Sequence, residues 1–203
     1  MSFHPVSIDT TLLVFALKSE AQELFDDFHT IYTGVGKVNA AYQLVLGLSA
    51  WKEKNGAYPE LVLNVGSAGS GLFPCGSIVN CTQFIQRDMD VTVFGHALFT
   101  TPNECLSPVF SAGLRCEDFP QGVCGSGDNF VTDGKMHGWN VVDMEAYALA
   151  KVCSGMNVPF CCLKYISDGA DTQAVKSWGN SLEATAQVLH DVVSKIVVSK
   201  KAR

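Results

Sequence analysis

The chain has 203 residues, of which 47% are hydrophobic and 17% are charged, and its formal net charge is −6. This composition supplies enough apolar side chains for a sizeable core and excludes an intrinsically disordered chain. The few arginines and the scattered lysines do not form the basic stripe that a nucleic-acid-binding protein normally carries. We therefore expect no nucleic-acid partner.

The apolar runs are too short to cross a bilayer, which takes about 20 consecutive apolar residues. The run at residues 12–17 is followed by Lys18 and Glu20 and has no basic segment before it, so it predicts a core strand and not a signal peptide. The eight cysteines include no C-x-x-C pair, and several lie in apolar segments, which is typical of reduced core residues. We expect a cytoplasmic protein without a membrane span or a disulfide framework.

Buried-strand patterns alternate with helical patterns along the chain. The expected strands are residues 12–17, a short strand near Ile31, 61–65, 78–85, 123–130 with a kink at residues 125–127, and 158–166. The expected helices are residues 19–28 with Ser19 as N-cap, 37–54, a helix that follows Glu145 and ends near Met156, and 177–198. Residues 96–120 have little periodicity and carry three prolines, so we expect a mobile loop there.

This alternation predicts a single α/β domain over residues 1–203. Its expected architecture is a three-layer α/β/α fold around a twisted, largely parallel mixed sheet. In such sheets, ligands bind beyond the carboxyl ends of the strands. Polar residues follow four expected strands or strand ends, at residues 17–20, 66–71, 143–145 and 167–171.

Each acid at these junctions has an ordinary structural explanation. Glu20 and Glu145 could complement a helix dipole, and Asp143 could cap a helix. Asp168 precedes a glycine, and Asp-Gly is a common turn pair. What needs a common explanation is that acids stand at three strand ends of one sheet.

Other motifs carry less information. Gly36-Lys37 lacks the first glycine and the hydroxyl residue of a P-loop. Residues 66–71 are glycine- and serine-rich, which suits either close approach of the backbone to a ligand or a flexible loop. The five histidines show no metal-binding spacing, and His96, beside the expected loop, is the one that could border a pocket. We expect no metal site.

Six segments together resemble one family, the purine nucleoside phosphorylase and nucleosidase superfamily. They are G-V-G-K-V-N-A-A at 34–41, N-V-G-S-A-G at 64–69, D-V-T-V-F-G at 90–95, S-G-D-N-F at 126–130, V-D-M-E-A at 142–146 and I-S-D-G-A-D at 166–171. The chain is most similar to the methylthioadenosine/S-adenosylhomocysteine nucleosidases, in a shortened form. The resemblance implies a nucleoside phosphorylase-like fold and hydrolysis of an N-glycosidic bond.

The resemblance also implies roles for the acids. Glu20, the last acid of the family's A-M-E-x-E segment, would position or deprotonate the attacking water. Asp168 would donate a proton toward N7 of the purine, and Glu145 would hold the ribose hydroxyls. These roles suit the chemistry, because breaking the bond builds positive charge on the ribose and negative charge on the base. Asp168 must therefore hold a proton near neutral pH. Asp143 would mainly cap the helix.

The substrate-binding positions follow from the same resemblance. Phe130 would stack on the base, and the backbone of Val131 would read its edge. Met144 would lie under the sugar. The remaining positions are Ser67, Ala68 and Gly69 on the ribose side, Ser167 on the base side, and Trp178 over the group at the 5′ carbon. The family also implies a homodimer whose partner closes the 5′ pocket, and no cofactor.

The chain departs from the family pattern at several positions. The hairpin between the first helix and residue 34 is nearly absent, and residues 132–140 replace a longer segment. Lys18 and Ser19 stand at two usual acid positions, and Arg87 and His96 also differ from the pattern. Because of these changes, the resemblance does not determine which group the substrate carries at its 5′ carbon.

Three alternatives remain. A phosphorylase would need a phosphate site, commonly an arginine, and no arginine stands at the first strand end, where Glu20 suits water instead. Futalosine is the main rival substrate, because Asp168 could serve either base. A protein that binds a nucleoside without cleaving it is the third alternative, since fold does not imply function.

Overall fold

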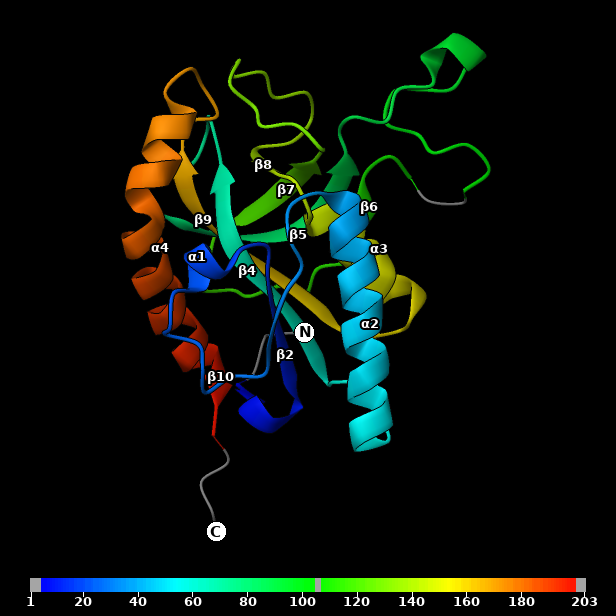
Figure 1. Cartoon of the computed structure of the whole chain (residues 1–203). Helices are drawn as coiled ribbons and strands as arrows, with labels where there is room; N and C mark the ends of the chain where they lie inside the picture. Colours follow the sequence, from blue (N-terminus) through cyan, green and yellow to red (C-terminus); the bar gives the residue numbers. More distant parts are fainter. Residues whose placement is uncertain (1–4, 105–106, 200–203) are drawn as a thin grey trace.

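A computed structural model describes residues 5–104 and 107–199 (Figure 1). The strands are β1 (Val6–Ser7), β2 (Thr11–Phe15), β3 (Thr30–Tyr32), β4 (Leu61–Gly69), β5 (Ile78–Gln86), β6 (Phe110–Ser111), β7 (Gln121–Ser126), β8 (Val141–Asp143), β9 (Phe160–Asp168) and β10 (Val197–Val198). The helices are α1 (Lys18–Ala21), α2 (Lys37–Asn55), α3 (Ala146–Gly155) and α4 (Ala174–Ile196), with 3-10 turns η1 (Ile8–Thr10) and η2 (Thr92–Phe94).

The central sheet runs in the order β3-β2-β4-β8-β7-β5-β6, and β9 pairs with both β4 and β5. The pairs β2–β3, β2–β4, β4–β9, β5–β7 and β7–β8 are parallel, whereas β4–β8, β5–β6 and β5–β9 are antiparallel. A separate parallel pair joins β1 to β10. The predicted mixed, largely parallel sheet is therefore confirmed.

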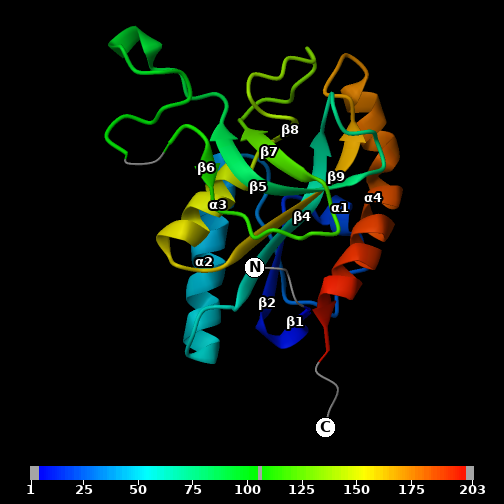
Figure 2. The ribbon, with the colours of Figure 1, turned by 180° about the vertical axis from the view of Figure 1, so that it is seen from behind.

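Helices cover both faces of the sheet, with α2 and α3 on one side and α1 and α4 on the other (Figures 1 and 2). Side chains of β2 alternate between the two cores. Leu12 and Val14 pack with α2 and α3, whereas Leu13 and Phe15 pack with Ala21 of α1 and with α4. This alternation follows from the two-residue period of a strand. The predicted three-layer architecture is confirmed.

Helix α2 matches its prediction to within one residue. It begins after Gly36, whose φ of +96° lies in the region that favours glycine. Ala40, Leu44 and Leu48 form its buried stripe at helical spacing. Gly56 ends the helix in the left-handed conformation, with φ of +77°.

The predicted helix over 19–28 is wrong in extent and in its cap. Helix α1 ends at Ala21, because Gln22 turns the chain with φ of +53°. Hydrogen-bonded turns then bring Phe25 into the core, where its ring packs edge-to-face on Phe15 at 4.8 Å. The N-cap position belongs to Leu17 and not to Ser19.

Several strand boundaries also differ from the prediction. Strand β4 continues through residues 66–69, so most of the glycine-rich segment is strand and not loop. It is held there by pairing with β9 from Val62 to Gly69, with a bulge between Ala68 and Gly69. Strand β7 ends at Ser126, and residues 127–130 lie outside it. Strand β9 runs two residues further than predicted, to Asp168, and α4 begins at Ala174.

The expected loop at 96–120 is mostly irregular where the structure describes it, and it contains β6. Residues 105–106 lie outside the described part. The seven described cysteines are free. Over residues 5–104 and 107–199, no helix combines the length and apolar character that a membrane crossing requires.

A buried ion pair joins Asp143, the last residue of β8, to Lys164 in the middle of β9. Lys164 Nζ lies 2.9 Å from Asp143 Oδ2, and the two side chains are 3% and 2% exposed. Asp143 also accepts hydrogen bonds from Ser126 Oγ at 2.5 Å and from the Ala146 N–H at 2.9 Å. The bond from the Ala146 N–H is of the predicted capping kind, although the N-cap position itself is Glu145, and the ion pair with Lys164 is a further contact that was not predicted.

The ion pair determines the charge state of both groups. Burial alone would raise the pKa of Asp143, but the Lys164 ammonium and the hydrogen bonds lower it below its usual value. Burial likewise opposes the charged form of Lys164, and Asp143 outweighs it and raises the pKa of Lys164. Both groups are therefore charged at neutral pH.

Replacing Lys164 with Met should destabilise the protein strongly, because Asp143 would remain buried without a counter-charge. We expect the free energy of unfolding to fall by about 3–5 kcal/mol in urea titrations. Arg115→Met is the control, because it breaks the exposed pair with Glu117 and should cost at most about 1 kcal/mol. Equal midpoints for the two variants would contradict a structural role for the buried pair.

Candidate active site

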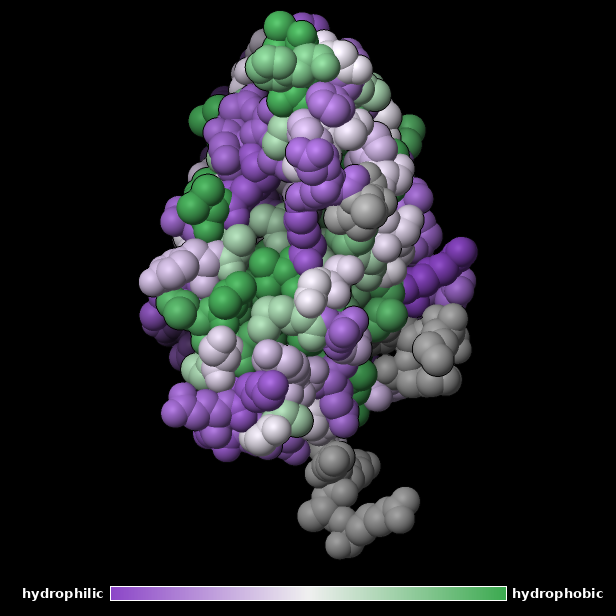
Figure 3. All heavy atoms as spheres, turned by 90° about the vertical axis from the view of Figure 1, so that its right-hand side faces the viewer, coloured by the Kyte–Doolittle hydropathy of each residue, from purple (hydrophilic) through white to green (hydrophobic). Residues whose placement is uncertain are grey.

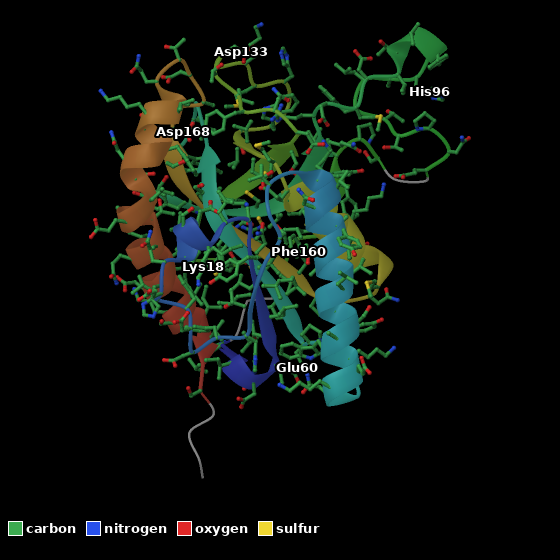
Figure 4. All side chains as sticks on the ribbon, viewed as in Figure 1. Lys18, Glu60, His96, Asp133, Phe160 and Asp168 are labelled. Carbon is green, nitrogen blue, oxygen red and sulfur yellow. The ribbon has the colours of Figure 1, made fainter. Side chains whose placement is uncertain are left out.

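A cavity of about 270 Å³ opens at the carboxyl ends of β4, β8 and β9. Figure 4 shows Asp168 at this end of the molecule and Glu60, which precedes β4, at the opposite end. All of the site residues predicted from the sequence line this cavity: Glu20, Ser67, Ala68, Gly69, Phe130, Val131, Met144, Glu145, Ser167, Asp168 and Trp178. Segments far apart in the sequence thus meet at one place.

Glu20 is 4% exposed and is held by three hydrogen bonds. Its Oε1 accepts from the Ser67 N–H at 2.9 Å and from Ser67 Oγ at 2.6 Å, and its Oε2 accepts from the Leu17 N–H at 3.2 Å. Trp178 Nε1 donates to the same Ser67 hydroxyl at 2.9 Å. A carboxylate offers about four acceptor positions, so Glu20 retains capacity for a further donor, such as water.

Glu145 stands at the start of α3 and is 7% exposed. Its Oε1 accepts from the Gly36 N–H at 2.8 Å, which leaves most of its acceptor positions free. Burial raises the pKa of Glu145 to about 7, the negative charge of Asp143 adds to this rise, and Lys164 opposes it. Glu145 can therefore change its charge near neutral pH.

Asp168 closes β9 and is 3% exposed. Its Oδ1 accepts from the Ala170 N–H at 2.9 Å, and its Oδ2 lies 2.8 Å from the Ser167 hydroxyl. The carboxylate lies against Gly69, where an added Cβ would come within 2.6 Å of Oδ1. Only glycine at position 69 leaves Asp168 this space.

The aromatic side of the cavity comes from residues 127–131. Phe130 is 43% exposed and lines the cavity, so an aromatic surface is open to a ligand. Arg87 holds the preceding backbone: it donates through Nε to Gly125 O at 3.2 Å and through Nη2 to Gly127 O at 3.2 Å. It also donates to Asn129, through Nη1 to Oδ1 at 2.8 Å.

A second set of charges ties this segment to the start of α2. Lys37 Nζ lies 2.6 Å from Asp88 and 3.0 Å from Asp128. Asp128 also accepts from the Lys37 N–H at 2.8 Å, and its own N–H donates to Asp88 at 2.9 Å. Burial alone would raise the pKa of Asp88, but the bonds from Lys37 and Asp128 lower it.

Sequence reasoning missed Arg87 as a lining residue and Lys164 as a partner of Asp143. A lysine inside the apolar strand pattern of 158–166 was the available signal, because a buried lysine requires a partner. Val35 and Val175 also line the cavity and carried no signal. His96 does not line it and lies on a separate extension of the molecule (Figure 4). No cluster of metal-ligating side chains occurs among the described residues.

Comparison with known proteins agrees with this geometry. The family model described as "Phosphorylase superfamily" matches residues 27–198. A curated relative, the 5′-methylthioadenosine/S-adenosylhomocysteine nucleosidase of Exiguobacterium sp. strain AT1b, is 32% identical over 178 residues, which are 76% of this chain and 72% of that protein.

Solved structures share the fold. The 5′-methylthioadenosine/S-adenosylhomocysteine nucleosidase of Helicobacter pylori, bound to butyl-thio-DADMe-Immucillin-A, superposes with a TM-score of 0.77 at 22% identity, covering 92% of this chain and 96% of that one. The futalosine hydrolase of the same organism gives a TM-score of 0.76 at 22% identity, covering 92% and 96%. The family predicted from the six segments is thus confirmed, and the chain belongs to the phosphorylase superfamily, together with the methylthioadenosine/S-adenosylhomocysteine nucleosidases.

Proposed function

We propose that this protein hydrolyses the N-glycosidic bond of a purine nucleoside of the methylthioadenosine or S-adenosylhomocysteine type. The products are the free base and a ribose derivative, and the base would enter purine salvage. The observation that carries this proposal is the convergence of three buried carboxylates, Glu20, Glu145 and Asp168, on one cavity with an exposed aromatic ring. The curated relative named above is a nucleosidase of this type.

Asp168 acts as the general acid. Its carboxyl group gives a proton to N7 of the purine while the bond between N9 and C1′ breaks, so the base leaves without a negative charge. Ser167 and the Ala170 N–H fix the orientation of this group through the hydrogen bonds described above. A positioned acid of this kind contributes about 10²–10⁴-fold to the rate.

Glu20 acts on the water. The water oxygen forms the new bond to C1′, and its proton passes to Glu20, so the protons lost by Asp168 and gained by Glu20 balance. Ser67 and Trp178 fix Glu20 through a chain of hydrogen bonds, which keeps the carboxylate from rotating. Such fixed orientation lowers the entropic part of the barrier.

Glu145 holds the ribose hydroxyls, because it has free acceptor positions and a diol offers two donors. Met144 packs against the sugar, and Phe130 stacks on the base, whose edge is read by the backbone of Val131. Trp178 lies on the side of the 5′ group, together with Val175. All of these residues line the cavity.

Hydrolysis is favoured over phosphorolysis by the charges around the cavity. Glu20 would repel a phosphate ion at the position where it can orient water. The one arginine in the cavity lining, Arg87, donates hydrogen bonds to the carbonyls of Gly125 and Gly127 and to Asn129. Four of its five N–H donors are thus taken, so Arg87 supports the protein backbone and cannot clamp a phosphate with paired hydrogen bonds.

Retention of all three acids also speaks against a protein that only binds nucleosides, since binding alone would not require both Glu20 and Asp168. Futalosine is the alternative substrate. It shares the purine end, so the difference from methylthioadenosine lies at the 5′ group, beside Val175 and Trp178.

The protein acts as a homodimer in this proposal. Val38, Tyr42, Val45 and Leu46 form an apolar stripe on the outer face of α2 and are between 41% and 77% exposed. Figure 3 views this side of the molecule and shows hydrophobic side chains gathered across its middle. Contiguous apolar surface of this kind marks an interaction site. Val35, just before α2, is 42% exposed and lines the cavity, so a second copy on the stripe would reach the 5′ side of the site.

The described cysteines are free and mostly buried, which suits a reducing compartment. We therefore place the protein in the cytoplasm.

Asp168→Asn should lower base release by about 10²–10⁴-fold, because the amide keeps the shape but cannot donate the proton. Chromatography of the base released from methylthioadenosine, S-adenosylhomocysteine, inosine and futalosine, with and without phosphate, measures this effect and identifies the substrate. Asp191→Asn, at an exposed position of α4, is the matched control. A normal rate for Asp168→Asn would disprove the mechanism, and release only with phosphate would make the protein a phosphorylase.

The pKa of about 7 for Glu145 predicts a pH dependence. Below this pH Glu145 is protonated and accepts fewer hydrogen bonds from the ribose. We expect kcat/KM to rise about tenfold per pH unit up to about pH 7 and then to level off. Glu145→Gln should lower kcat/KM and remove this acidic limb. If the limb persists in that variant, another group causes it.

Tyr42→Glu should convert the dimer into monomers, because it places a charge in the apolar stripe. Sedimentation equilibrium would measure the mass, and Leu24→Glu, an exposed leucine outside α2, serves as control. A monomeric wild-type protein with full activity would refute the dimer proposal.

A further inference from the structure

A second cavity, of about 330 Å³, adjoins the first. The two share Arg87, Asn129, Phe130 and Val131 as a common wall. Residues 132–139 supply the rest of its lining. From the resemblance, this segment is expected to be shorter than its counterpart in the family, so the cavity occupies a region where this chain is expected to differ from the pattern.

The second cavity lies at the end of the active site that holds Asp168. The Gly134 N–H donates to the Ala170 carbonyl at 2.9 Å, which ties the segment to the turn after Asp168. Figure 4 shows Asp133 and Asp168 toward the same end of the molecule. In a purine, the substituent at C6 stands next to N7. A base that receives a proton from Asp168 at N7 therefore directs its C6 substituent toward this segment.

Trp139 lines the cavity and carries a buried hydrogen-bond donor without a partner among the described residues. The residue is 8% exposed, and its ring packs on Gly125, where an added Cβ would lie 2.7 Å from the indole, and on Phe99 at 5.3 Å between centroids. Its Nε1 is buried and has no hydrogen-bond partner among the described residues. Buried N–H groups are nearly always paired, so this donor is available to a ligand acceptor once a small movement of the cavity wall exposes it.

The other polar groups of the cavity are also mainly donors. Lys135 carries a positive charge, and His137 offers a ring N–H in either charge state. Arg87 has five N–H donors, of which three make the bonds described above, a fourth donates from Nη2 to the Asn129 carbonyl, and the fifth has no partner among the described residues. The one acid in the lining, Asp133, is paired with Lys135 at 3.2 Å, and both side chains are largely exposed. Such a wall favours an acceptor-rich, anionic group.

We propose that this cavity is a specificity subsite for a carboxylate carried on the C6 amino group of the purine. The substrate class is then an N6-carboxyalkyl adenine nucleoside, and the inference rests on the proposed nucleosidase function. The carboxylate accepts from the Trp139 N–H and is attracted by Lys135 and Arg87. When the base is unsubstituted adenine, water occupies the subsite.

The test compares two free bases, N6-(2-carboxyethyl)adenine and N6-propyladenine, by calorimetric titration of the wild-type protein. Free bases bind without being turned over, so the result does not depend on catalysis. We expect the carboxylate to lower Kd by about tenfold or more relative to the propyl group. Base release from adenine nucleosides that bear these two N6 groups, with unsubstituted adenine as reference, should show the same preference in kcat/KM.

Two variants locate the effect. Trp139→Phe and Lys135→Met should each reduce the Kd ratio between the two bases, whereas Trp51→Phe and Lys54→Met, both on α2, serve as matched controls. A wild-type ratio near one, or a ratio that neither variant reduces, would overturn the proposal. Loss of the proposed function is a separate outcome, recognised by the absence of base release from the unsubstituted nucleoside while the free bases still show their ratio.

Discussion

The buried ion pair between Asp143 and Lys164 is the interaction on which the active site depends. Asp143 receives the Ser126 hydroxyl and the Ala146 N–H, and Ser126 Oγ in turn accepts from the Tyr147 N–H at 2.9 Å. Strand β7, strand β9 and the first turn of α3 are thereby joined at one carboxylate. Glu145 lies within this junction, so its position is set by the pair. The negative charge of Asp143 raises the pKa of Glu145, and the positive charge of Lys164 lowers it. Without Lys164, the pKa of Glu145 would therefore be higher still.

A second constraint is the close approach of carboxylates to the backbone of β4. Glu20 lies over Gly66, where an added Cβ would be 3.3 Å from its Oε1, and Asp168 lies over Gly69 at 2.6 Å. Any side chain at Gly69 would displace Asp168. Gly66 and Gly69 thus act in the same way: each leaves space for an acid from another element, so that Glu20 and Asp168 reach the same cavity. Strand β4 tolerates these weak strand formers because β9 pairs with it from Val62 to Gly69.

The sequence predicted the positions of strands and long helices because these depend on local apolar patterns, as in Leu44 and Leu48 of α2. It placed Glu20, Glu145 and Asp168 together because strand ends converge at one edge of a parallel sheet. The prediction failed where contacts between distant residues determine the ends of the elements. The end of α1 at Gln22 follows from burying Phe25 against Phe15, and the extension of β4 follows from its partner strand. Partners of buried charges, such as Lys164, are set by register between distant strands, which no local pattern contains.

In the proposed function, chemistry and selectivity are carried by different parts of this fold. Asp168 ends β9, Glu145 is the N-cap of α3 just after β8, and Glu20 lies in α1 just after β2, so none of the three acids comes from a surface loop. The end of the cavity that we propose to bind the base is formed instead by residues 127–139, which are held by Arg87, by the Lys37–Asp88–Asp128 charges and by one bond to Ala170. Shortening such a segment can open space beside the base without moving Asp168, since Asp168 is fixed by Ser167 and by the backbone after β9. A nucleosidase of this architecture can therefore acquire a new preference at the base while its bond-breaking apparatus stays unchanged.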